Sequence, residues 1–160
     1  MSSDVPIGTV IMWAGQLGSL PIQWLLCDGS LKSQARFAEL YKVIGTSFGG
    51  SPPAGEFYLP NLQGRFVRGV DASTKFDPDA ANRVDGVTGD VVGGKVGSYQ
   101  PDAVQQHTHN YEMFPNGRGG IAAGQYWDVG MSKTGGVNDA RVSTETRPAN
   151  VALFYVIKAE

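Results

Sequence analysis

The chain has 160 residues, and its 22 glycines and 9 prolines interrupt nearly every stretch that could form a long helix, so turns and short strands should dominate. The formal net charge of -2, without a run of either sign, argues against nucleic-acid partners. No apolar stretch reaches the roughly 20 residues that a bilayer crossing needs, and the start lacks a signal-peptide layout, so we expect cytoplasmic synthesis without membrane insertion.

The first elements expected are two short strands. Residues 7–13 are rich in β-branched and aromatic side chains and precede a loop rich in glycine and proline. Residues 24–27 form a short apolar run that ends at Asp28 and Gly29, a turn pair in which glycine supplies a positive φ. Cys27 is the only cysteine, and we expect it to be a small buried apolar residue without a chemical role.

One helix is expected between Ser33 and Gly45. Its apolar positions follow the spacing i, i+3, i+4 and i+7, at Phe37, Leu40, Tyr41 and Ile44. Ser33 can accept a hydrogen bond from an early amide, and Gly45 can adopt the left-handed conformation that closes the far end.

Two arginines follow the loop of residues 46–60. Arg65 and Arg68 flank an apolar pair among turn residues, without a phosphate-type glycine loop that opens a helix. Two roles are open to them, ordering the loop through backbone carbonyls or carboxylates and binding an anionic ligand. The first is favoured.

Residues 71–95 are polar and predict a loop or linker. Their aspartates do not match the spacing of a twelve-residue calcium loop, so we interpret them as solvated turn carboxylates: Asp77, Asp79, Asp85 and Asp90.

The end of the chain predicts a strand with neither face in water. In residues 151–157 both alternating sets of side chains are nonpolar, which places this strand in a core or at a subunit interface.

His107 and His109 are the only histidines and the only pair with metal-ligand character. On an extended backbone they project to the same face, but two ligands are too few for a closed site. Three copies around a threefold axis would present six imidazoles, which suit octahedral divalent iron and are tolerated by zinc or nickel. From spacing alone, two surface histidines without a ligand role are the favoured interpretation.

No catalytic grouping stands out. Both histidines are used as a pair, which leaves no independent base for a serine, and no Gly-x-Ser-x-Gly turn is present. A pair of acids for glycoside cleavage could still be brought together by the fold, but a non-enzyme is expected.

Four motifs resemble the phage tail collar domain family: PIGTVIMWAG at residues 6–15, WLLCDG at 24–29, FAELYKVIG at 37–45 and FYLPNLQGRF at 57–66. The later GSYQPDA at residues 97–103, followed by His107-Thr108-His109 and RPANVAL at 147–153, is similar to the C-terminal tips of short tail fibres. The resemblance implies an α+β collar module at residues 1–70, a linker at 71–95 and an interwoven, glycine-rich trimeric head at 96–160.

In that family the His-x-His pairs of three intertwined chains bind an axial metal, so the resemblance reverses the preference at His107 and His109. It also implies a cell-surface receptor, often a glycan or lipopolysaccharide. Four residues in a glycine-bearing segment are candidates for receptor binding, namely Phe114, Arg118, Tyr126 and Trp127, because exposed aromatic faces can stack on sugars. Packing of Tyr126 and Trp127 in the trimer core is an equal alternative.

The sequence therefore predicts a homotrimeric, receptor-binding tip of a phage tail fibre or of a phage-tail-like contractile injection device, in contact with other tail or baseplate proteins. A cap or plug that closes a tail tube without binding a receptor is the main alternative. A glycan depolymerase is the least favoured.

Overall fold

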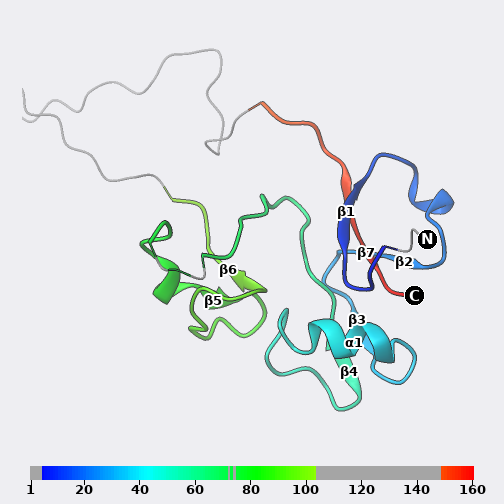
Figure 1. Ribbon diagram of the computed structural model, residues 1–160, viewed down its shortest axis with the longest axis horizontal. Coiled ribbons are helices and arrows are strands. Elements are labelled where there is room, and N and C mark those ends of the chain that lie inside the picture. The colour runs from blue at the N-terminus through cyan, green and yellow to red at the C-terminus, as the bar shows by residue number, and fades with distance from the viewer. Residues whose placement is uncertain (1–4, 72, 74, 104–148) are drawn as a thin grey trace, which may run out of the picture. The chain divides into compact units, whose positions relative to one another are not determined.

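The computed structural model describes residues 5–71, 73, 75–103 and 149–160 (Figure 1). The chain divides into two units, and residues 1–102 with 151–160 form the first. All of the helices and strands given below belong to this unit. Only residues 103, 149 and 150 of the second unit are among those described.

A three-stranded antiparallel sheet joins the two ends of the chain. The strand order is β1-β7-β2, with β1 at Val10–Trp13, β2 at Trp24–Leu26 and β7 at Phe154–Lys158. The C-terminal strand lies between the two N-terminal strands (Figure 1). The predictions of strands within residues 7–13 and 24–27 are confirmed, with shorter bounds.

The predicted burial of the last strand is confirmed at its centre. Val156 and Ile157 project to opposite faces of β7 and are 0% and 1% exposed. The strand begins later than the apolar pattern suggests, because Val151 is 87% exposed and precedes β7 by three residues. Apolar content alone therefore does not predict the residue at which the strand pairing of β7 begins.

The expected helix is present but shorter. The structure places α1 at Ala38–Ile44, with Gly45 at its C-terminal end at φ +53°. Ser33 Oγ accepts a hydrogen bond from the Arg36 N–H at 3.4 Å, as predicted, but Ser33 is not the N-terminal cap of the helix, because Phe37 occupies that position without a side-chain cap. Ser33 instead ends strand β3, Leu31–Ser33, where its backbone pairs with Glu56.

The remaining elements are short. Strand β3 pairs with β4, at Glu56–Tyr58, and β5, at Val84–Asp85, pairs with β6, at Ser98–Tyr99. Two 3₁₀ turns, η1 at Leu17–Ser19 and η2 at Ala80–Asn82, complete the described elements. A single α-helix among short antiparallel strands confirms the α+β class for the part of the chain that the structure covers.

The core lies between α1, β4 and one face of the β1-β7-β2 sheet. Its buried members are Cys27, Phe37, Leu40, Ile44, Phe57, Leu59, Ile157 and Ala159. Cys27 is 1% exposed, and its burial, together with the nearby Asp28 charge, raises the pKa of the thiol to about 12. The prediction of Cys27 as a buried apolar residue is confirmed.

Candidate functional site

The residues that the sequence marks as the metal site and the receptor site lie outside the described residues. They are His107, His109, Phe114, Arg118, Tyr126 and Trp127. Their roles therefore stay predictions. The charged residues of the described part form a separate arrangement.

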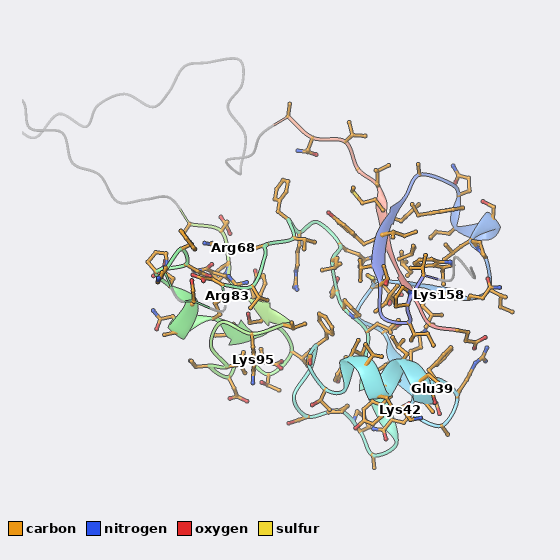
Figure 2. All side chains as sticks on the ribbon, viewed as in Figure 1. Glu39, Lys42, Arg68, Arg83, Lys95 and Lys158 are labelled. Atoms are coloured by element: carbon orange, nitrogen blue, oxygen red, sulfur yellow. The ribbon has the colours of Figure 1, made fainter. Side chains whose placement is uncertain are left out.

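Two arginines lie around one buried aspartate in the part of the chain that the structure describes. Asp77 is 6% exposed and lies 3.5 Å from both guanidinium groups, with Oδ1 facing Arg68 Nη2 and Oδ2 facing Arg83 Nη1. Figure 2 labels both arginines. Two cations beside one carboxylate offset the cost of removing its charge from water.

Arg83 is fixed on every side of its guanidinium group. Its Nε and Nη2 donate to Oγ and to the carbonyl oxygen of Ser98 at 2.9 and 3.1 Å, and Nη1 donates to Gln100 Oε1 at 2.9 Å. The side chain is only 13% exposed. These contacts tie the residue before β5 to strand β6 and to the residue after it, so Arg83 holds this hairpin together.

Asp71 orders the turn that leads to Asp77. Its carboxylate accepts hydrogen bonds from the hydroxyl and the N–H of Ser73, and from the N–H groups of Phe76 and Asp77. These bonds, the Ser73 hydroxyl first, hold the pKa of Asp71 well below its ordinary value. The charged form of Asp71 therefore positions the backbone next to the arginine cluster.

Asp85 joins two segments that are distant in sequence. Oδ1 accepts from the N–H groups of Val87 and Thr88 at 2.8 and 2.9 Å, and Oδ2 accepts from the Gly50 N–H at 2.9 Å. Burial alone would raise the pKa of Asp85, but these three hydrogen bonds and the charge of Lys95 outweigh it, and the pKa is lowered.

The expectation that the aspartates of residues 71–95 are solvated is therefore wrong for Asp77 and Asp85, each 6% exposed. Asp85 accepts hydrogen bonds from three backbone amides, and Asp77 is ion-paired with two guanidinium groups. Folding alone brings these partners near the two carboxylates. A signal was present in Arg83, a cation between the acids Asp79 and Asp85 in a polar segment. Its partners at residues 98–100 could not be chosen from spacing.

The structure supports the loop-ordering role for Arg65 and Arg68. Arg65 donates to the carbonyl oxygen of Asn61 at 3.2 Å, and its guanidinium carbon lies 4.4 Å from the centre of the Tyr99 ring. Arg68 is paired with Asp77. Each arginine thus has a partner within the chain.

A depression lies beside the arginine cluster and is lined by Arg68, Asp71, Asp77, Arg83 and Lys95, among others. Within the described ranges, no three His, Cys, Asp or Glu side chains gather as a metal site would require. None of the helices described there has the length and apolar character to span a membrane.

The chain matches one family model and is similar to several known proteins. The family model of the phage tail collar domain matches residues 8–67, the segment that contains α1 and strands β1 to β4. Protein RhiB of Rhizobium leguminosarum bv. viciae is 45% identical over 98% of this chain and 75% of RhiB.

Two more distant relatives also align along nearly the whole chain. The short tail fiber protein gp12 of Enterobacteria phage T4 is 28% identical over 98% of this chain but only 35% of gp12. StfE of Escherichia coli strain K12 is 24% identical over 98% of this chain and 89% of StfE. The alignments to these proteins therefore extend well past the segment that the collar model matches.

Proposed function

Because the chain belongs to the phage tail collar domain family, we propose that it is a non-enzymatic structural protein of the tail-fibre type, which forms a homotrimer and binds a receptor. The observation that carries the proposal is the alignment of 98% of this chain with a short tail fiber protein. The alignment extends beyond the collar module into the later part of the chain. A virion tail or a tail-like particle is then its location.

The exposed surface of the described residues supports an assembly role. Large apolar side chains stay in water at many positions, with Phe66 73%, Phe76 82% and Val151 87% exposed. Scattered apolar residues are ordinary on a monomer, but aromatic rings this exposed are typical of surfaces that partners cover. Other copies of the chain and other tail or baseplate proteins are the partners proposed.

The proposed metal site consists of His107 and His109 from three copies. One chain supplies two imidazoles, and three chains supply the six donors that an octahedral divalent ion takes. Imidazole suits iron, which we favour, and also nickel and zinc. The ion, when bound, would supply no chemistry beyond holding the three chains at one axis.

Native mass spectrometry tests this assembly, because it reports subunit number and retained metal together. The wild type should appear as a trimer with one metal ion, and the double variant His107→Ala/His109→Ala should lose the ion and dissociate more readily on dilution. A control variant that carries Asp102→Ala, near the pair but without an imidazole, should retain the ion. Retention of the ion by the double variant would reject the site.

The proposed receptor is a cell-surface glycan or lipopolysaccharide, bound through Phe114, Arg118, Tyr126 and Trp127. Binding of the purified trimer to whole cells and to a glycan array measures this directly. Substitution of Tyr126 and Trp127 by alanine should abolish binding and leave the trimer intact. Dissociation of that variant would instead place the two rings in the trimer core.

The same measurements separate the rival functions. A trimer that binds neither cells nor glycans would act as a cap or plug of a tail or injection tube. New reducing ends after incubation with envelope polysaccharide would show a depolymerase. The absence of binding would reject the receptor role but not the structural one.

A further inference from the structure

The depression beside the two arginines has more positive than negative side chains on its wall. It measures about 60 Å³, and its charged lining residues are Arg68, Arg83, Lys95, Asp71 and Asp77. Figure 2 labels the three cations. Three cations against two carboxylates give the wall a formal charge of +1. A space of this size holds a few water molecules or one small polyatomic group of a ligand.

Both carboxylates of the wall already have partners within the chain. Asp71 accepts two hydrogen bonds at each oxygen, from Ser73 at Oδ1 and from the N–H groups of Phe76 and Asp77 at Oδ2. Asp77 Oδ1 is buried and accepts no hydrogen bond, and the Arg68 guanidinium covers it at 3.5 Å. A cation in the depression would have to compete with these internal donors, so an anion is the better match.

Two of the three cations keep donors that the fold does not use. Arg83 is engaged at Nε and at both terminal nitrogens. Arg68 is 51% exposed, and its contact with Asp77 involves Nη2 alone, without a hydrogen bond to any described residue. The exposed Lys95 ammonium has no ion pair or hydrogen bond in the described ranges, although its charge lowers the pKa of Asp85. Both side chains are therefore available to a ligand.

Glycine backbone forms another part of the wall. Gly69, Gly94 and Gly97 line the depression, and because they lack side chains they contribute main-chain atoms to it. None of their three N–H groups donates a hydrogen bond to another described residue. Unpaired amides beside cations make up the concave donor sites in which turns bind anions. The depression thus carries an excess of hydrogen-bond donors over free acceptors.

We infer that this depression binds a phosphate group, either as the free ion or as an ester carried by a larger molecule. A phosphate offers at least three acceptor oxygens, and a guanidinium can hold two of them at once. Arg68 would supply that fork, Lys95 a second charge and the glycine amides the remaining donors. A carboxylate has only two oxygens and fills fewer of these donors. The inference goes beyond the proposed receptor site, whose residues lie in a different part of the chain.

Amide chemical shifts of the full chain test the site residue by residue. Titration with inorganic phosphate, at an ionic strength held constant with chloride, should move the amide signals of Gly69, Gly94 and Gly97 to saturation. Glucose 6-phosphate should move the same signals, and tighter binding of the ester than of the free ion would identify an esterified phosphate as the natural ligand. Acetate should bind at least about fivefold more weakly than phosphate. Equal binding of acetate would overturn the assignment to phosphate.

Substitution of the two available cations tests their roles. Lys95→Gln should weaken phosphate binding at least about fivefold, because it removes a charged donor from an exposed position without an internal partner. Arg68→Gln should act in the same direction, and Lys95→Gln decides alone should loss of the Asp77 contact unfold the other variant. Lys42→Gln is the matched control, because Lys42 is an exposed cation of α1 that does not line the depression. It should bind phosphate like the wild type.

The outcomes separate this inference from the proposed function. Equal affinities of Lys95→Gln and Lys42→Gln for phosphate would overturn the inference, as would the absence of a saturable shift up to about 100 mM phosphate. Either result leaves the trimer and its receptor role standing. Saturable binding that Lys95→Gln weakens supports the site even in a protein that binds no cells, because the titration reads the depression directly.

Discussion

The Asp85 carboxylate accepts a hydrogen bond from the Gly50 N–H at 2.9 Å, although the two residues are 35 positions apart. Gly50 belongs to the loop after α1, and Asp85 belongs to β5. The other carboxylate oxygen closes the turn at Val87 and Thr88. One buried side chain therefore satisfies three amides from two segments.

Asp85→Asn should destabilise the protein by about 1–3 kcal/mol. An amide offers one acceptor oxygen, so its NH₂ group would face either the Gly50 amide or the turn amides and leave a buried donor unsatisfied. Asp90→Asn is the control, because it removes the same charge at an exposed position of the same segment. Urea denaturation followed by circular dichroism measures both, and equal midpoints for the two variants would contradict the role of Asp85.

The lowered pKa of Asp85 predicts how stability depends on pH. Since the folded pKa lies below the ordinary value of 3.8, the unfolded chain takes up a proton first as the pH falls. The stabilisation is therefore present above about pH 4 and is lost as the pH drops through the folded pKa.

Urea midpoints of the wild type and Asp85→Asn, taken from about pH 6 to about pH 3, check this directly. The gap between the two proteins should narrow as the pH falls, because the variant has no carboxyl group to protonate at this position. A constant gap would show that the charge of Asp85 does not stabilise the fold.

Local patterns in the sequence predicted the elements whose side chains follow a simple period. The spacing of Phe37, Leu40, Tyr41 and Ile44 predicted the helix, and the doubly apolar run at the C-terminus predicted a strand buried at its centre. The same patterns could not predict the start of α1. Ser33 belongs to β3 and pairs with Glu56 of β4, which lies 23 residues further along the chain. Pairing between distant segments decides such boundaries.

The charged cluster was missed for a related reason. Asp77 and Arg83 lie in a polar segment that local patterns mark as a loop, and their burial depends on Arg68, Ser98 and Gln100. No period relates these positions. The metal pair and the receptor residues rest on the family resemblance, and their geometry lies outside the described residues.

Gly97→Ala should be far more damaging than Gly89→Ala. Both glycines have a positive φ, +85° and +79°, so each substitution incurs a backbone cost of about 1–2 kcal/mol. A Cβ at Gly97 would also overlap the Ser47 carbonyl oxygen, whereas a Cβ at Gly89 meets nothing within 4 Å.

Thermal or urea unfolding of the two variants isolates the steric part of the effect. We expect Gly97→Ala to be at least about 2 kcal/mol less stable than Gly89→Ala, because backbone atoms at Ser47 must move apart. Similar stabilities would mean that residues 46–50 do not lie against Gly97 in solution.

Arg83→Ala should cost about 3 kcal/mol of stability, because it leaves Asp77 charged and buried beside the half-exposed Arg68 alone. Arg36→Ala removes the same charge at an exposed position, where the guanidinium lies 5.1 Å from the Phe37 ring, and should cost about 1 kcal/mol or less. Addition of Asp77→Asn to Arg83→Ala should recover part of the loss, because the unpaired charge disappears while the side-chain volume is kept. Urea denaturation of the four proteins gives the coupling, and strictly additive losses from Arg83→Ala and Asp77→Asn would show that the two side chains do not stabilise each other.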